Sequence, residues 1–121
     1  MKASRNFDME EFSCHCGCGL NLTHPYLVSV LQDLRDHFGE PVKITSSTRC
    51  PEHNMNIGGA PQSKHLLGIA ADIQVTNTPP SVVHTYLETT YPNAFGLGLY
   101  PSFVHLDVRP ERARWGDIGL T

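Results

Sequence analysis

The sequence lacks long hydrophobic runs, basic clusters and a high content of charge. It contains no uninterrupted apolar stretch of the length that a transmembrane helix needs, so no membrane insertion is predicted. The basic residues at 1–6 lead into an acidic segment and not into an apolar one, so no secretory signal is predicted. The formal net charge of −3, with no basic stripe to contact phosphates, argues against a nucleic-acid partner.

No internal repeat, low-complexity segment or linker divides the chain. Its 121 residues fit one domain with one hydrophobic core. Apolar residues make up 40% and charged residues 17% of the sequence, as in an ordinary globular protein. We therefore predict a single domain over residues 1–121, expected to be a monomer, in which residues 1–22 form an irregular arm that contains cysteines.

Hydrophobic spacing predicts two helices and three or four strands. One helix is expected from an N-cap at Thr23 to about His37, and a second from an N-cap at Thr78 to about Tyr91. His84 falls within the second helix and is expected to be exposed. The strands are expected at 42–46, 67–75, 96–100 and 103–108. This order predicts an α+β fold, with a small, mainly antiparallel sheet and the helices packed on one face.

Four cysteines occur, at Cys14, Cys16, Cys18 and Cys50. Structural zinc sites favour cysteine pairs separated by two to four intervening residues, which Cys14 and Cys18 satisfy, with Cys16 or His15 and Cys50 completing the set. A disulfide from Cys50 to one of the first three, or buried thiols, is the preferred alternative, and the sequence cannot choose the connectivity. Either arrangement would tie the N-terminal arm to the loop after the strand at 42–46.

A carboxylate stands in the middle of an apolar segment, at Asp72. A buried charge is costly unless it is paired, hydrogen-bonded or bound to a cation. His65 precedes this segment, and His105 lies in a second apolar segment further along the chain. Two histidines and one aspartate, with a fourth position left to water, suit a catalytic zinc ion. We predict that His65, Asp72 and His105 bind one Zn²⁺.

The same residues carry a family resemblance. Residues 63–72 read Ser-x-His-x-x-Gly-x-Ala-x-Asp, and residues 103–107 read Phe-Val-His-x-Asp. This pattern resembles the zinc D,D-peptidases of peptidase family M15, in particular the short phage-type branch, whose fold is shared with the hedgehog signalling domain. The segments at 44–54 and 58–63 resemble the family's arginine-bearing segment and the lead-in to its first ligand.

The resemblance implies roles for further residues. Arg49 corresponds to the family's substrate arginine, and its planar guanidinium suits a carboxylate or a polarised carbonyl; the alternative is a surface arginine paired with Glu52. Gln62 and Ser63 either donate hydrogen bonds to substrate or stabilise the turn before His65. Trp115 either forms the wall of a peptide groove or closes the hydrophobic core.

The general base is less directly indicated. Side chains of a strand alternate between its faces, so Asp107 projects to the same side as His105. Better-known family members place an acidic residue or a histidine three residues before the last ligand, where this chain has Ser102. We therefore predict Asp107 as the base, with Glu52 as the next candidate. The alternative is that Asp107 orients a ligand imidazole.

The predicted function is a zinc metallopeptidase that hydrolyses peptide bonds in peptidoglycan stem peptides, as a D,D-carboxypeptidase or an endopeptidase. Such an enzyme would be made in the cytoplasm and act at the bacterial cell wall, in phage lysis as an endolysin or in wall remodelling. The alternative is a non-catalytic module of the same fold, which keeps zinc and binds the wall or serves a structural role. The serine at position 102, where a base would be expected, is the reason to retain this alternative.

Overall fold

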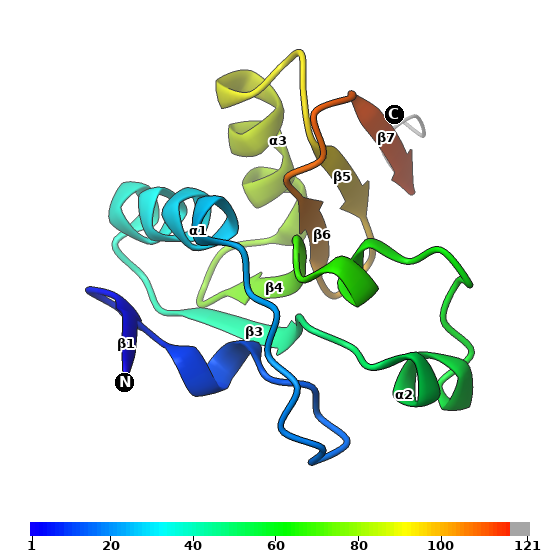
Figure 1. Cartoon of the computed structure of the whole chain (residues 1–121). Coiled ribbons are helices and arrows are strands. Elements are labelled where there is room, and N and C mark those ends of the chain that lie inside the picture. Colours follow the sequence, from blue (N-terminus) through cyan, green and yellow to red (C-terminus); the bar gives the residue numbers. More distant parts are fainter. Residues whose placement is uncertain (117–121) are drawn as a thin grey trace.

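The computed structural model describes residues 1–116 (Figure 1), so residues 117–121 of the predicted domain lie outside the described residues. A five-stranded sheet forms its centre, in the order β3 (Val42–Ser46), β4 (Ala70–Val75), β6 (Val104–Asp107), β5 (Gly96–Leu99) and β7 (Ala113–Gly116). The first four strands pair antiparallel, and β7 pairs in parallel with β5. The predicted α+β class with a mainly antiparallel sheet is confirmed.

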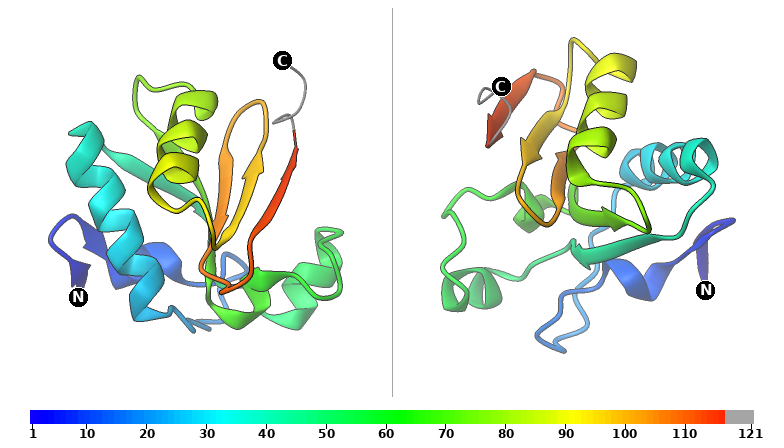
Figure 2. Two further views of the ribbon diagram at one scale, coloured as in Figure 1. Left: turned by 90° about the horizontal axis from the view of Figure 1, so that it is seen from above. Right: turned by 180° about the vertical axis from the view of Figure 1, so that it is seen from behind.

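Two helices, α1 (Pro25–Phe38) and α3 (Pro80–Thr90), pack on one face of this sheet (Figure 2). Their buried leucines and valines share one core with Ala71 and Ile73 of β4 and with Val104 and Leu106 of β6. Because strand side chains alternate, the residues between these core positions face the opposite side. That side is covered by the segment with the short helices α2 (Pro51–Asn56) and η2 (Lys64–Leu67).

The predicted helix spans are confirmed to within about two residues, but both predicted N-caps are wrong. His24 caps α1, since its Nδ1 accepts a hydrogen bond from the Tyr26 N–H at 3.1 Å. The Thr23 hydroxyl instead donates to the side chain of Asn21. Pro79 precedes α3, and the Thr78 hydroxyl donates to the Thr76 carbonyl. In both cases a proline at the first helical position fixes where the helix begins.

The expectation that His84 is exposed is wrong, because α3 turns this side chain toward the core. Val82 is 46% exposed, whereas His84, which was expected to be exposed, is 7% exposed. The side chains that point inward are Val83, His84 and Leu87. Among the described residues, Nε2 of His84 has no hydrogen-bond partner, and burial lowers the pKa of this histidine.

The N-terminal arm is more ordered than predicted. A two-stranded antiparallel sheet, β1 (Lys2–Ser4) and β2 (Phe7–Asp8), is followed by the 3₁₀ helix η1 (Met9–Phe12). Phe7 and Phe12 are buried in the core, with their ring centroids 6.1 Å apart. The prediction of an irregular arm is wrong for this part, because two aromatic side chains bury enough apolar surface to order the backbone between them.

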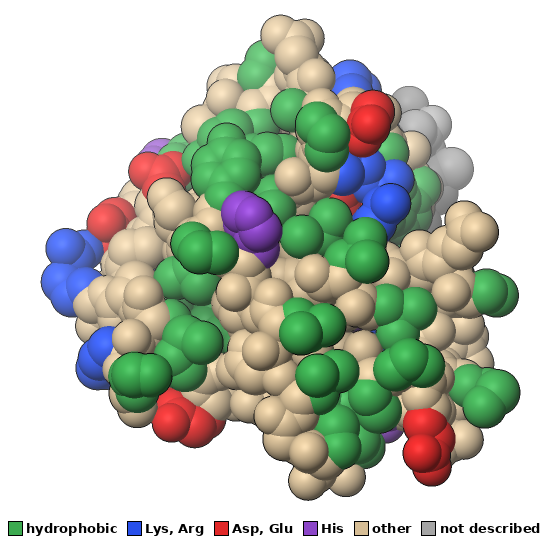
Figure 3. Space-filling model, viewed as in Figure 1, with side chains coloured by type: hydrophobic (Ala, Val, Ile, Leu, Met, Phe, Trp, Pro, Cys, Tyr) green, Lys and Arg blue, Asp and Glu red, His purple; other side chains and the backbone are tan. Residues whose placement is uncertain are grey.

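The exterior carries a mixture of side-chain types. On the face shown in Figure 3, basic, acidic and hydrophobic side chains are interspersed. Within residues 1–116, none of the helices has the length and apolar content that crossing a bilayer requires.

Candidate metal centre

One row of residues across the sheet positions two of the predicted ligands. His105 of β6 pairs with Asp72 of β4 on one side and with Gly98 of β5 on the other. Trp115 of β7 pairs in turn with Gly98. Residues directly opposite each other on neighbouring strands project from the same face, so the Asp72, His105 and Trp115 side chains stand on the face away from α1 and α3.

Gly98 is needed in this row because the indole leans across it. A Cβ at this position would lie 2.5 Å from Nε1 of Trp115, closer than any real contact. Without a side chain there, the Trp115 ring reaches the imidazole of His105, with ring centroids 5.1 Å apart. The aromatic wall beside the second histidine therefore depends on a glycine that the sequence alone did not single out.

The third predicted ligand, His65, comes from η2. Ser63 begins this turn by accepting a hydrogen bond from the His65 N–H at 3.2 Å, and Gly68 ends it in the left-handed conformation at φ 72°. The ring is buried, with Nδ1 2.7 Å from the carbonyl oxygen of Ser47. These contacts fix the ring with Nε2 directed at the sheet.

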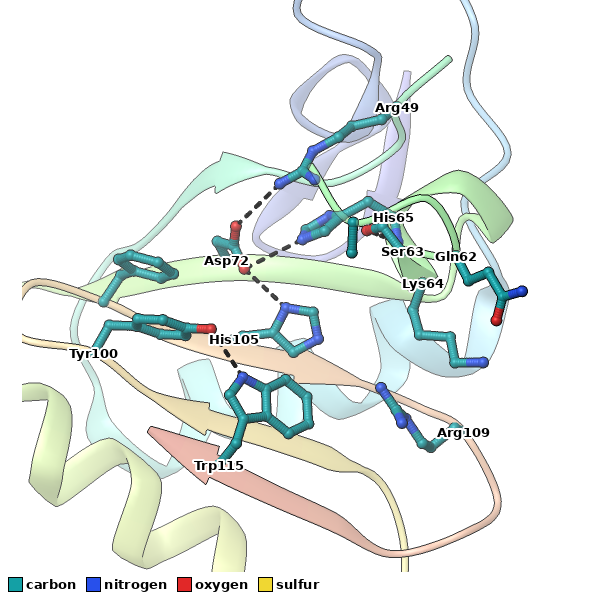
Figure 4. Close-up of a pocket in the computed structure, with 12 residues that line it drawn as sticks. Arg49, Gln62, Ser63, Lys64, His65, Asp72, Tyr100, His105, Arg109 and Trp115 are labelled. Carbon is teal, nitrogen blue, oxygen red and sulfur yellow. Dashed lines mark hydrogen bonds and ion pairs between the residues drawn. The ribbon is translucent and has the colours of Figure 1, made fainter. Parts of the chain in front are cut away.

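The structure brings the three predicted ligands together (Figure 4). Oδ1 of Asp72 lies 3.3 Å from Nε2 of His65 and 3.0 Å from Nδ1 of His105. A tetrahedral zinc ion with bonds of about 2.0–2.2 Å has ligand–ligand separations of about 3.3–3.6 Å. The spacing of the three donors therefore fits a zinc ion.

The tautomers of the two histidines give an independent test of this fit. The Ser47 carbonyl can only accept, so Nδ1 of His65 carries the hydrogen in that bond. Nε2 of His105 donates in the same way to Oδ2 of Asp107 at 2.8 Å. In the neutral imidazoles the remaining nitrogens then direct lone pairs at Asp72. Three convergent lone pairs repel one another unless a cation lies between them.

Both carboxylates near these histidines are ionised at neutral pH. Burial raises the pKa of Asp72, but the adjacent imidazoles of His105 and His65 outweigh it and hold this pKa well below its usual range. Burial likewise raises the pKa of Asp107, and hydrogen bonds from His105 and Arg109 hold it well below its usual range. Asp72 therefore offers an ionised oxygen to a metal.

Asp107 is fully buried behind His105. Its Oδ1 accepts from Nε of Arg109 at 2.7 Å and from the Gly96 N–H at 3.2 Å, and its Oδ2 accepts from Nη2 of Arg109 at 2.8 Å. With both oxygens occupied, the carboxylate does not line the pocket described next. Its role as general base stays a prediction, and these contacts support the alternative that it orients the imidazole.

A pocket of about 550 Å³ opens beside the three ligands. The predicted substrate residues Arg49, Gln62, Ser63 and Trp115 all line it. Among the described residues that line it, Asp72 is the one carboxylate. The next candidate base, Glu52, lies instead beside a separate hollow near Cys50.

The comparisons with known proteins place the chain in a family. The sequence matches Peptidase M15 over residues 5–107. The protein belongs to peptidase family M15. No curated protein gives a significant match. The matched region of this M15 peptidase contains the three ligands, Arg49 and Asp107, and it ends before Trp115. Membership makes the chain a metallopeptidase, and the peptidases of this family use zinc.

Arg49 of the peptidase reaches the metal centre from the loop after β3. Its Nη2 lies 3.7 Å from Oδ2 of Asp72, and its Nη1 donates to Oδ1 of Asn54 at 3.0 Å. Nε donates more weakly to Oγ of Ser46, at 3.3 Å. In the described part of the chain its ion-pair partner is therefore Asp72 and not Glu52, the partner in the alternative interpretation.

An aromatic wall closes the opposite side of the pocket. Nε1 of Trp115 donates to the Tyr100 hydroxyl at 2.8 Å, and the Tyr100 ring stacks on Phe103 with centroids 4.5 Å apart. The guanidinium of Arg109 lies 5.4 Å from the centroid of the Trp115 ring. Sequence reasoning missed Arg109 and Lys64, which also lines the pocket. Arg109 could have been found by continuing the alternation of side chains two residues beyond Asp107.

The four cysteines lie together but are not bonded. All four are free thiols, with Cys14 buried and Cys16 and Cys18 exposed. The Sγ atoms of Cys14 and Cys16 are 3.5 Å apart, and those of Cys16 and Cys50 are 3.6 Å apart, whereas a disulfide bond measures about 2.05 Å. These four residues therefore form no disulfide, and of the expected buried thiols only Cys14 is buried. The cluster does join the N-terminal arm to the Arg49 loop.

Proposed function

We propose that this M15 peptidase hydrolyses peptide bonds in peptidoglycan stem peptides, as a D,D-carboxypeptidase or an endopeptidase. One zinc ion would be held by His65, Asp72 and His105. The observation that carries the proposal is the convergence of three lone pairs on one point that opens onto a pocket lined by cationic side chains. A bound zinc ion supplies Lewis-acid chemistry, which polarises a scissile carbonyl and makes water a better nucleophile at neutral pH.

The chain itself keeps the ligands in the required state. Ser47 accepts from His65 and Asp107 accepts from His105, so each imidazole is held in the tautomer that presents a lone pair. Partners of this kind fix the orientation of ligand rings and raise their basicity. We therefore propose Asp107 as a positioning residue that acts through His105. A general-base role would require its carboxylate to reach the pocket, from which the His105 ring separates it.

The cations of the pocket fit the charge of the proposed substrate. Stem peptides carry carboxylates, and a guanidinium offers a planar pair of donors to a carboxylate. Arg49 contacts Asp72 only at 3.7 Å, so its Nη2 is free to turn toward a substrate carboxylate or carbonyl. Lys64 and Arg109 add positive charge on the other sides of the pocket. Gln62 and Ser63 would donate hydrogen bonds to the peptide backbone.

The aromatic side of the pocket fits the small apolar groups of the same substrate. Trp115, Tyr100 and Phe103 present ring surface across the pocket from Arg49, and Arg109 lies beside the Trp115 ring. Alanine methyl groups of a stem peptide would pack against these rings while its carboxylates face Arg49. Action on this substrate places the enzyme at the bacterial cell wall, in phage lysis or in wall remodelling.

A second candidate function is favoured by the lack of a free carboxylate among the described pocket residues. A non-catalytic module of the same fold would bind zinc and the wall without hydrolysing it. The deciding experiment is digestion of purified peptidoglycan, followed by mass spectrometry of the muropeptides. We expect shortened or unlinked stem peptides with wild type and none with His65→Ala. A protein that sediments with the wall but releases no new amines would support the binding module and overturn the peptidase proposal.

A further inference from the structure

The cluster of four cysteines lies outside the candidate metal centre and has no part in the proposed peptidase reaction. It joins two distant segments, the loop at 14–18 and the residue that follows Arg49. We propose that Cys14, Cys16, Cys18 and Cys50 form a structural zinc site that fixes the Arg49 loop to the N-terminal arm. This inference does not depend on the substrate of the enzyme.

The spacing of the sulfurs fits a tetrahedral metal. All four Sγ atoms lie within 4.8 Å of one another, and the two pairs that contact are 3.5 and 3.6 Å apart. A zinc ion with Zn–S bonds of about 2.3 Å separates its sulfurs by about 3.8 Å. A disulfide would draw one pair to about 2.05 Å and leave the other two thiols without a function. The observed arrangement is thus close to that of a four-cysteine zinc site.

The backbone of the loop is shaped to present its thiols to one point. Gly17 and Gly19 both adopt the left-handed conformation, at φ 85° and 84°, which glycine reaches without steric cost. The Cys14 N–H donates to the Leu20 carbonyl at 2.8 Å and closes the loop. The chain therefore turns back on itself within the cysteine segment, and the three sulfurs come together.

Backbone donors are directed at two of the sulfurs. The Cys50 N–H donates to Sγ of Cys14 at 3.3 Å, and the His53 N–H donates to Sγ of Cys50 at 3.3 Å. Hydrogen bonds to sulfur favour the thiolate, which is the form that binds metals. Four thiolates in a tetrahedron select zinc or iron, and a closed set of four cysteines with no open position is typical of structural zinc.

The site would hold the substrate arginine in place. Cys50 caps the start of α2, and this helix carries Asn54, which accepts a hydrogen bond from Arg49. The Arg49 N–H also donates to the His65 carbonyl at 3.0 Å. A metal that fixes Cys50 therefore fixes both the backbone and the side-chain partner of Arg49. Its loss would loosen Arg49 without removing a ligand of the catalytic centre.

Metal analysis of the purified full chain tests this inference. We expect two zinc ions per molecule in wild type, and one each in Cys18→Ser and in His65→Ala. After cobalt substitution, wild type and His65→Ala should both show sulfur-to-cobalt charge-transfer absorption, and Cys18→Ser should lose it. The Cys18→Ser melting temperature should fall by more than about 5 °C, and its KM for peptide should rise while kcat changes less.

The other outcomes are equally informative. Three results would each overturn the proposal. They are a single zinc ion in wild type that Cys18→Ser retains, iron in place of zinc, and a loss of titratable thiols through disulfide formation. If Cys18→Ser does not fold, the metal content and the cobalt spectrum of His65→Ala still decide the question. Because that variant lacks a predicted catalytic ligand, zinc at the cysteines is measured whether or not the protein proves to be a peptidoglycan peptidase.

Discussion

Asp107 lies directly behind His105, with its Oδ2 accepting a hydrogen bond from Nε2 of the imidazole at 2.8 Å. The opposite nitrogen of the same ring faces Asp72 at 3.0 Å. The imidazole thus stands between two carboxylates, one in the pocket and one buried beneath it. This arrangement separates the two roles considered for Asp107, because a residue that orients a ligand and one that accepts a proton respond differently to substitution.

Asp107→Asn should weaken zinc binding by about 10- to 100-fold, the usual effect of removing the partner of a ligand histidine. At saturating zinc, much of the activity should return. The measurement combines a zinc dissociation constant, from competition with a chelator, with rates at several zinc concentrations. Unchanged zinc affinity together with a rate loss of about 100-fold at saturating zinc would show instead that Asp107 is the general base.

Two glycines of β5 offer a matched pair of substitutions. A Cβ at Gly96 would lie 2.3 Å from Oδ2 of Asp107, and a Cβ at Gly98 would lie 2.5 Å from Nε1 of Trp115. Overpacking of this kind costs about 1–3 kcal/mol. The Cβ of Gly96→Ala would push against the Asp107 carboxylate, which accepts hydrogen bonds from His105 and Arg109. This variant should therefore lower both stability and zinc affinity.

Gly98→Ala should keep zinc, because it displaces the indole and not a partner of a ligand. Its expected effect is a higher KM at nearly unchanged zinc affinity. Thermal unfolding and zinc titration of both variants provide the comparison. Equal zinc affinities for Gly96→Ala and Gly98→Ala would contradict the assignment of Asp107 as the support of His105.

Arg49→Lys should lower kcat/KM by at least about tenfold, or 1.4 kcal/mol of transition-state stabilisation. Lysine keeps the charge but loses the planar pair of donors, and it cannot reach Asp72 and Asn54 together. Arg5→Lys is the control, since Arg5 is exposed and pairs with Asp36 at a distance from the pocket. Wild-type kinetics in Arg49→Lys would remove Arg49 from the substrate site.

Trp115→Phe and Tyr100→Phe each remove the same hydrogen bond, between the indole N–H and the phenol oxygen. If this bond holds the aromatic wall in place, each change should raise KM by a similar factor. The double variant should then be little worse than either single one, because the effects of residues in direct contact are not additive. Fully additive effects on KM in this cycle would show that the two side chains act independently.

His84→Leu should make stability less sensitive to acid. Burial lowers the pKa of His84 in the folded state, whereas the unfolded chain has an ordinary value of about 6.5. Below that pH the unfolded state binds more protons, so wild-type stability falls as the pH drops toward 5. The variant should lose less stability between pH 7 and pH 5 in denaturant titrations. Thr85→Leu, at an exposed position of the same helix that carries no titratable group, should keep the wild-type slope.

The three residues of the candidate metal centre could be singled out from the sequence because each stands in a local pattern. Asp72 interrupts an apolar strand. In the strand that contains His105 and Asp107, the alternation of side chains puts these two residues on the same face. The contacts that decide the role of Asp107 come from Arg109 and Gly96, and a strand pattern does not contain them. The burial of His84 depends on how α3 is turned against the sheet, which hydrophobic spacing alone fixes only to about one residue.

The parts that escaped prediction depend on pairing between distant segments. Nothing local in residues 113–116 indicates that they join β5 in parallel, in a sheet that is otherwise antiparallel. The free thiols are a similar case, since the distance between Cys50 and Cys16 is set by the whole fold. In both cases the sequence of one segment does not show which distant segment it will contact.

The residues that line the pocket come from two parts of the chain, and one of these parts is the parallel strand β7. The predicted metal ligands lie within the part that matches the family, and Trp115 comes after it, on the outermost strand of the sheet. A change in β7 can alter the shape of the pocket that a peptide would enter, without disturbing a predicted metal ligand or the residue that orients it. Preference among substrates can therefore diverge independently of the hydrolytic machinery, by replacement of a single short strand at the edge.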